Sequence, residues 1–172
     1  MFVPKGLLLW IFISNVIVLF DAFFVINRPD TLKGGKYYDI FQPYEHYYKF
    51  DKLYDMNDDS FVVIQSWLNA VEAMIAFVGV ILCLASCRGK NLAGAFICTI
   101  VETMIFWKTV IFVWYDRDWL TPEALNYSPE SILCYYFPSY LWIIFPFLTM
   151  ITVPKKIFRA YMDLVKEKEK TA

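Results

Sequence analysis

Four ionisable side chains lie inside long apolar runs of the sequence: Asp21, Glu72, Glu102 and Lys108. A charge near the centre of a bilayer costs roughly 2.5–3.5 kcal/mol on insertion scales. We therefore expect these side chains to face other helices or a wet cavity rather than lipid. A carboxyl group in such a place can move a proton on and off a hydrophobic substrate, or it can hold a cationic amphiphile.

The stretch SWLNAVEAMIAF, residues 66–77, carries one of these acids within a polar stripe. At about 100° per residue, Gln65, Asn69 and Glu72 fall within about 60° of one another on a helix. One interpretation is hydrogen bonding between helices, worth about 0.6 kcal/mol per bond. It explains the two amides but not the carboxylate, which also needs a proton or a cation. The stripe favours a ligand-binding or catalytic pocket, with hydrogen bonding alone as the alternative.

Helix geometry predicts which side chains share a depth. At a rise of 1.5 Å per residue, Asp21 and Lys108 lie about 8 and 10 Å below one boundary, and Glu72 and Trp142 about 16 and 15 Å. Glu102 lies deeper, at about 20 Å, so we expect it to make a separate contact. The other four are predicted to share one pocket, where the Trp142 ring stabilises a cation and the Lys108 ammonium pairs with Asp21.

The elements that must position these residues are four apolar runs, near residues 7–26, 61–85, 93–115 and 132–153. Each approaches or exceeds the roughly 20 residues that cross a bilayer as a helix, and none alternates as a barrel strand would. The hydrophobic fraction is 59%, against about 45–50% in soluble domains. We predict an all-α fold, an integral membrane four-helix bundle. Residues 1–160 form the four-span transmembrane domain, and residues 161–172 form a charged cytosolic tail.

Loop charge predicts the orientation of the bundle. The link after the second run carries Arg88 and Lys90 without an acid, and the tail after the fourth run is rich in Lys and Arg. The positive-inside rule places both segments, and with them both termini, in the cytosol. Segments 27–60 and 116–131 then face the lumen or the exterior. No basic tract suited to nucleic acid is present, so the predicted surroundings are a lipid bilayer.

The final residues, KEKTA, place Lys168 and Lys170 at the spacing of a dilysine retrieval signal. Such a signal is read by a receptor on a cytosolic tail, which agrees with the charge argument. It predicts a multi-pass protein of the endoplasmic reticulum membrane. Because Lys-rich ends are common, a chance match is the alternative.

The segment PYEHYYKFDKLY, residues 43–54, is unusually rich in tyrosine. Tyrosine is amphipathic and favours the headgroup level of a membrane. We predict a partly helical, amphipathic lumenal cap between the first and second spans, lying on the bundle. A loosely ordered interfacial loop is the alternative.

The cysteines and the one histidine carry no metal-binding pattern. No CxxC or Cys/His spacing occurs among Cys83, Cys87, Cys98 and Cys134, and His46 has no ligand set nearby. We therefore predict free thiols, no metal and no cofactor.

Three stretches resemble the EXPERA-domain family, which includes the emopamil-binding sterol Δ8–Δ7 isomerase and the sigma-2 receptor. VLFDAFFV places Asp21 where these relatives carry an acid, and YYKFDKLY gives Tyr47 and Asp51 the isomerase-like spacing Y-x-K-x-D-x-x-Y. YLWIIFP is similar to the isomerase's L-W-L-x-x-P and aligns Trp142, while Glu72 corresponds to a glutamate that both relatives carry. The resemblance is remote and spans nearly the whole chain.

The resemblance implies a sterol-like ligand. If the protein is an isomerase, Glu72 donates a proton to a sterol double bond and Asp21 helps accept the second one. The other candidate ligand contacts are Gln65, Asn69, Lys108, Ser139, Trp142, Tyr47 and Asp51.

The chain departs from the isomerase pattern at three positions. Ile17 and Ser139 stand where the isomerase has a histidine and an asparagine, and Lys108 replaces a small or uncharged residue. These departures favour ligand binding over turnover and keep a non-catalytic sterol- or lipid-binding regulator as the alternative. A small proton-coupled transporter is a further alternative. The sequence leaves open whether the protein forms a homodimer.

Overall fold

Four long helices dominate the computed structural model, which describes residues 1–56 and 59–171. Residues 57, 58 and 172, which belong to the predicted loop 27–60 and tail 161–172, lie outside the described residues. The described chain is 81% helical and contains no strand, which confirms the all-α prediction. By length and composition, four helices can cross a membrane. The long helices are α1 (Lys5–Ile26), α4 (Ser60–Leu84), α5 (Arg88–Asp116) and α8 (Phe137–Thr171).

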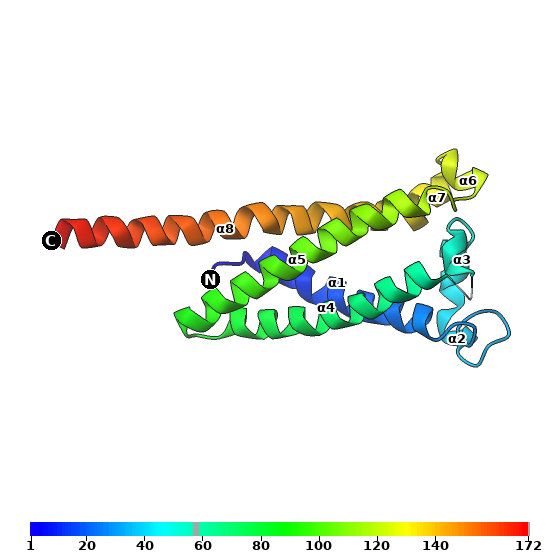
Figure 1. The fold of residues 1–172 in the computed structure, drawn as a ribbon, viewed down its shortest axis with the longest axis horizontal. Helices are drawn as coiled ribbons and strands as arrows, with labels where there is room; N and C mark the ends of the chain where they lie inside the picture. Colours follow the sequence, from blue (N-terminus) through cyan, green and yellow to red (C-terminus); the bar gives the residue numbers. More distant parts are fainter. Residues whose placement is uncertain (57–58, 172) are drawn as a thin grey trace.

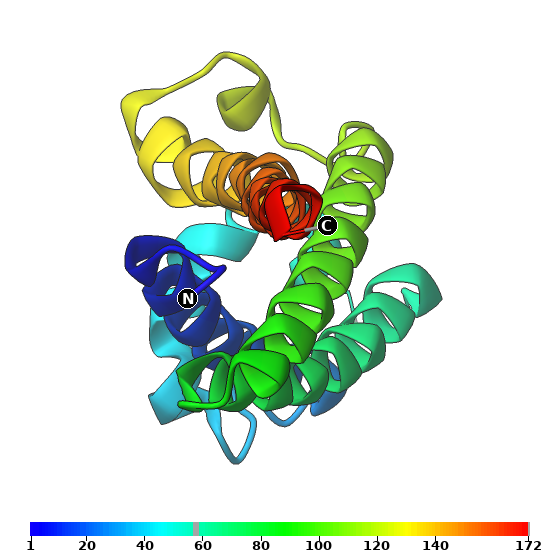
Figure 2. The same cartoon turned by 90° about the vertical axis from the view of Figure 1, so that its left-hand side faces the viewer.

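The long helices run alternately up and down, so that both chain ends and the α4–α5 link lie at one end (Figure 1). We call this the basic end, after Lys5, Arg88 and Lys90. The opposite end carries the cap, residues 38–54, and we call it the cap end. Viewed along the helices, α4 lies between α1 and α5, and α5 lies between α4 and α8 (Figure 2).

The cap consists of short helical turns, which confirms the predicted partly helical character of residues 43–54. Phe41, Leu53 and Tyr54 of the cap are buried against Phe24 of α1 and Val62 of α4. A backbone bridge between Asp51 and Leu120 also ties the cap to the segment after α5. The short elements are α2 (Tyr38–Phe41), η1 (Gln42–Tyr44), α3 (Glu45–Tyr48), η2 (Lys52–Tyr54), α6 (Pro122–Leu125), α7 (Pro129–Ser131) and η3 (Ile132–Tyr136).

Local hydrogen bonds fix the ends of the central pair of helices. The Asp59 carboxylate accepts a hydrogen bond of 2.7 Å from the Val62 backbone N–H and so caps the start of α4. Asn91, near the start of α5, donates its side-chain amide to the Cys83 carbonyl near the end of α4. The Asn91 side-chain oxygen accepts from the Phe2 backbone N–H at 3.1 Å, so one asparagine joins the chain start to the α4–α5 turn.

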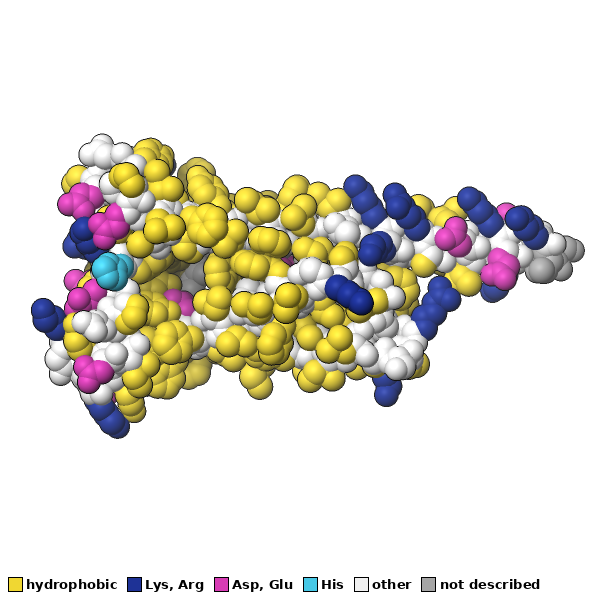
Figure 3. Space-filling model, turned by 180° about the vertical axis from the view of Figure 1, so that it is seen from behind, with side chains coloured by type: hydrophobic (Ala, Val, Ile, Leu, Met, Phe, Trp, Pro, Cys, Tyr) yellow, Lys and Arg dark blue, Asp and Glu magenta, His cyan; other side chains and the backbone are white. Residues whose placement is uncertain are grey.

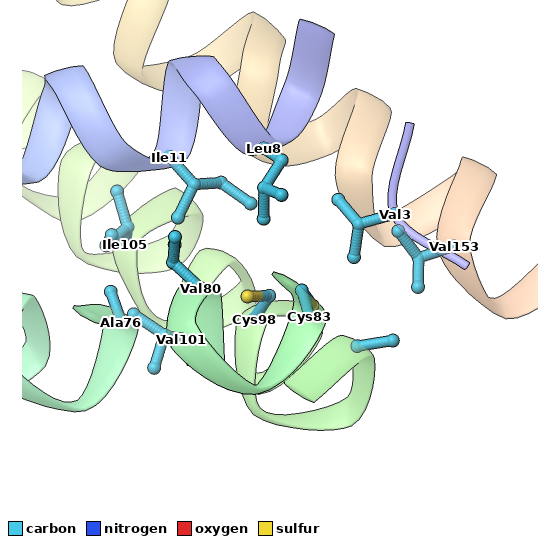
Figure 4. Packing of buried hydrophobic residues seen from close by; sticks show 11 residues of the cluster. Val3, Leu8, Ile11, Ala76, Val80, Cys83, Cys98, Val101, Ile105 and Val153 are labelled. Carbon is cyan, nitrogen blue, oxygen red and sulfur yellow. The ribbon is translucent and has the colours of Figure 1, made fainter. Parts of the chain in front are cut away.

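Small residues bring α4 and α5 close together at the basic end. One buried hydrophobic cluster contains Val80 and Cys83 of α4, Cys98 and Val101 of α5, and Ile11 of α1 (Figure 4). Such packing leaves little room for added volume. The close approach of α4 and α5 positions the polar residues that the same two helices carry nearer the cap end.

Replacing Gly94 by alanine is expected to destabilise the α4–α5 pair. The new Cβ would lie 2.5 Å from the Cys83 backbone nitrogen and 2.6 Å from the Gly79 carbonyl oxygen, so the two helices must move apart. Overpacking of this kind typically costs about 1–3 kcal/mol, measurable as a lower Tm of the purified protein. Gly89→Ala on the same helix is the matched control, since the nearest atom is the Cys87 Sγ at 4.0 Å. Equal Tm values for the two variants would contradict the close packing.

Candidate ligand-binding site

A pocket of about 350 Å³ lies beneath the cap, between the four long helices. Small-molecule sites in proteins span about 300–1,000 Å³ and are mostly apolar with a few placed polar groups, and this lining fits that description. Seven of the nine predicted site residues line it: Asp21, Tyr47, Gln65, Asn69, Lys108, Ser139 and Trp142. The fold brings these seven side chains to one pocket. Their role in ligand binding stays a prediction.

The pocket is walled off at one end by contacts between α1 and α8. Trp10 stacks on Phe145 with ring centroids 4.2 Å apart and meets Trp142 edge-on at 5.4 Å. Nearer the cap, Ile17 of α1 and Ser139 of α8 line the pocket. Figure 3 shows the resulting hollow in this face of the molecule, close to the cap and within the belt of apolar side chains.

Asp21 is the acid that the pocket presents directly. One carboxylate oxygen accepts a hydrogen bond from the Tyr54 hydroxyl at 3.1 Å, and the other accepts from the Tyr44 hydroxyl at 3.3 Å. Both tyrosines belong to the cap. Burial, followed by the nearby charge of Asp21, raises the pKa of each tyrosine above its usual value, so both remain hydrogen-bond donors at neutral pH. The cap therefore fixes the orientation of the Asp21 carboxylate from above.

Lys108 pairs with Glu72, so the predicted pairing of Lys108 with Asp21 is wrong. The Lys108 ammonium donates to a Glu72 carboxylate oxygen, and the two side chains are 13% and 5% exposed. The reason is the helix order: α5 packs directly on α4, whereas α1 lies beyond it. Glu72 does not line the pocket; Lys108 does. The glutamate that the sequence favoured as the proton donor is thus screened from the pocket by a lysine.

Glu102 is a buried acid of α5 that stands apart from the Lys108–Glu72 ion pair. Its side chain is 1% exposed, and neither carboxylate oxygen has a hydrogen-bond partner among the described residues. It does not line the pocket, and the separate contact that we expected for it stays a prediction. A buried carboxyl group without a hydrogen-bond partner is costly in an apolar interior.

Asp51 lies outside the pocket lining and joins the cap to the rest of the fold. It is fully buried; one oxygen accepts from the Leu53 N–H at 2.9 Å, and the other has no hydrogen-bond partner among the described residues. Asp116 is its acidic neighbour. Asp116 in turn accepts from the Tyr135 hydroxyl. Burial and then the neighbouring Asp116 raise the pKa of Asp51 well above its usual range. A proton shared by the two carboxyl groups therefore helps to hold the cap in place.

The stability of the cap is expected to fall as pH rises. Because the pKa of Asp51 is raised in the folded protein, the folded state holds this proton more tightly than the unfolded chain does. Stability is greatest below the ordinary aspartate pKa of 3.8 and declines as pH rises from there through the raised value. The groups that surround Asp51 are Asp116, Tyr47, Tyr54, Tyr135 and Arg28.

Hydrogen exchange of the cap amides between pH 4 and pH 8, corrected for intrinsic exchange, measures this dependence. Asp51→Asn removes the titrating group and keeps the side-chain volume, so its cap stability should be nearly independent of pH. A wild-type profile as flat as that of the variant would contradict the shared proton.

The fold and the site define a class: a helical protein whose four long helices are apolar enough to span a membrane and enclose a pocket with one acid at its surface. No known protein family, curated protein or solved structure matches the chain. The resemblance to the EXPERA-domain family therefore stays a prediction carried by three short stretches of sequence. Tyr44 and Tyr54 were not among the predicted site residues. Tyr54 is the last tyrosine of the Y-x-K-x-D-x-x-Y spacing, and the tyrosine-rich composition of the cap is the signal for Tyr44.

Proposed function

We propose that the protein is a four-span membrane protein of the endoplasmic reticulum that binds a sterol-like or cationic amphiphilic ligand. The observation that carries the proposal is the pocket beneath the cap, where Asp21 is held by two tyrosines among mostly apolar walls. The basic end would face the cytosol together with both termini, by the positive-inside rule. The Lys168 and Lys170 spacing supports the compartment, and the resemblance to the EXPERA-domain family supports the ligand class.

The shape of the site suits a ligand that arrives from the bilayer. The hollow lies on the face between α1 and α8, at the level of apolar side chains (Figure 3). A rigid apolar ligand would fill the space beside Ile17 and Phe112. Its polar end, a hydroxyl or an ammonium, would donate to the Asp21 carboxylate, and the Trp142 ring would favour a positive charge nearby.

Binding without turnover is the form that the site supports best. A sterol isomerase needs an acid that reaches the double bond, and Glu72 is engaged by Lys108 instead of facing the pocket. One observation favours isomerisation as a second candidate: Lys108, which binds Glu72, itself lines the pocket and could pass a proton into it. Incubating the purified protein with a Δ8-sterol and analysing the products by mass spectrometry separates the two. Conversion that is lost in Glu72→Gln would establish the isomerase.

A pocket-filling substitution tests the proposed function directly. Ser139 lines the pocket and donates only to the Tyr135 carbonyl of its own helical turn, at 2.8 Å. Ser139→Phe should therefore reduce the affinity for a fluorescent sterol and for a cationic amphiphile at least tenfold in nanodiscs, because the ring occupies the cavity. Ser139→Ala, which enlarges the pocket slightly, should bind within about twofold of wild type, roughly 0.4 kcal/mol. Saturable binding that is equal in both variants would place the ligand elsewhere.

A further inference from the structure

The last part of α8 extends beyond the bundle at the basic end (Figure 1). Val153 is its last buried residue, and it packs against Val3 at the start of the chain (Figure 4). From residue 154 to residue 170 no side chain is buried. We call residues 155–171 the distal segment. It is helical throughout, and only near its start does a partly buried side chain, Ile157, pack against the core.

The distal segment is strongly amphipathic. At about 100° per residue, five of its large apolar side chains fall within an arc of about 120°, and Met162 lies about 40° beyond it. Three of them are far more exposed than a packed face allows: Phe158 at 63%, Tyr161 at 61% and Leu164 at 45%. The apolar face is completed by Ile157 and Val165.

The opposite face of the distal segment is basic. Lys155, Arg159, Lys166 and Lys170 fall within about 60° of one another, and across the segment basic residues outnumber acids. Lysine and arginine side chains gather over this end of the molecule (Figure 3). A basic amphipathic helix with aromatic residues on its apolar face is typical of helices that lie in a membrane interface.

Pro154 separates the distal segment from the membrane-length part of α8. A proline inside a helix has no N–H to donate to the preceding turn and is a common site of bending. The bilayer surface lies near this point if α8 spans the membrane. A bend here would turn the segment, about 25 Å long at 1.5 Å per residue, onto that surface with its apolar face inward.

We propose that the distal segment binds the anionic lipid surface next to the basic end of the bundle. Phe158, Tyr161 and Leu164 enter the headgroup region, and the basic face attracts lipid phosphates and serines. Each Lys or Arg near such a surface contributes about 1 kcal/mol. The bundle anchors the segment at the surface, so even a weak intrinsic affinity keeps it bound. The choice of lipid over a second protein copy rests on the net charge, because the segment carries six basic residues against three acids, a surplus that anionic lipid neutralises and a second copy of the segment does not.

A fluorescent probe on the apolar face tests the proposal in the full chain. Tyr161→Cys, in a Cys87→Ser background, carries an environment-sensitive dye in nanodiscs of phosphatidylcholine alone or with 30% phosphatidylserine. We expect at least a twofold rise in emission and a blue shift in the anionic discs, reduced by 0.5 M salt. The same dye at Lys156→Cys, off the apolar face, should change little. Binding of ligand to the pocket plays no part in the readout.

Charge reversal supplies the decisive comparison. A triple variant with Lys155→Glu, Arg159→Glu and Lys166→Glu should show no rise in dye emission in anionic discs. A control variant with Lys33→Glu and Lys36→Glu at the cap end should show the same rise in emission as the unmodified segment. Equal emission in neutral and anionic discs would overturn the proposal. A rise that appears only when two copies share a disc would overturn it in favour of a protein–protein contact.

Discussion

Lys108→Met is expected to lower the free energy of unfolding by about 3–5 kcal/mol, because breaking a buried ion pair from one side leaves an uncompensated charge. The substitution keeps an unbranched apolar side chain, so lost volume contributes little. Glu72 then remains buried without a cation. Reversible unfolding of the purified protein in mixed detergent, followed by circular dichroism, measures the loss.

The charge explanation predicts a rescue. Adding Glu72→Gln to Lys108→Met removes the stranded carboxylate and should restore most of the lost stability, since neutral replacements of buried ion pairs are often tolerated. Lys90→Met, an exposed position near the start of the same helix, is the matched control and should lie within about 0.5 kcal/mol of wild type. If the double variant is no more stable than Lys108→Met, the loss comes from packing and the ion pair is not its cause.

Much of the candidate site follows from helix periodicity and depth. Gln65 and Asn69 were predicted to share a face, and the structure places both on the pocket. Asp21 and Trp142 were predicted to meet in the same cavity from the first and last spans, and both line it. These positions could be predicted because a spanning helix fixes a side chain's height by its residue count and its direction by a period of 3.6.

The lateral order of the helices could not be predicted in the same way. Lys108 and Asp21 have similar calculated depths, yet Lys108 meets Glu72 because α5 packs on α4. The residue count gives the depth of a side chain in the bilayer. It does not give which helix lies beside that side chain, because helix packing depends on the whole fold. Glu102 illustrates the same point, since its depth alone does not show that its carboxyl group is buried without a hydrogen-bond partner among the described residues.

The cap contacts were the hardest to predict. Tyr44 and Tyr54 reach Asp21 from short helical turns whose path depends on buried contacts such as Phe41 against Phe24. Such short turns have no sustained hydrophobic periodicity, so the sequence does not show which way their side chains point. Asp51 was predicted as a ligand contact from the spacing of a resemblance. Its carboxyl group instead accepts from the Leu53 N–H and neighbours Asp116, which comes close to it only in the folded chain.

Asp21→Asn is expected to weaken the binding of a cationic amphiphile 10- to 100-fold while changing the binding of a neutral sterol less than threefold. Hydrogen bonds to charged groups contribute about 1.5–3 kcal/mol, and each 1.4 kcal/mol is about tenfold in affinity. Asparagine has nearly the same volume and keeps one oxygen that can accept from Tyr44 or Tyr54. The substitution therefore removes the charge while leaving the cap in contact with α1.

The comparison of two ligands identifies the cause. Competition binding in nanodiscs, with a tertiary amine and an uncharged sterol measured on the same protein preparation, gives both affinities. Glu45→Gln is the matched control, because Glu45 is an acid of the cap that accepts from Tyr38 outside the main pocket. Equal losses for both ligands would mean that the cap has shifted and the pocket has changed shape. Unchanged binding of the amine would show that Asp21 does not receive the ligand's charge.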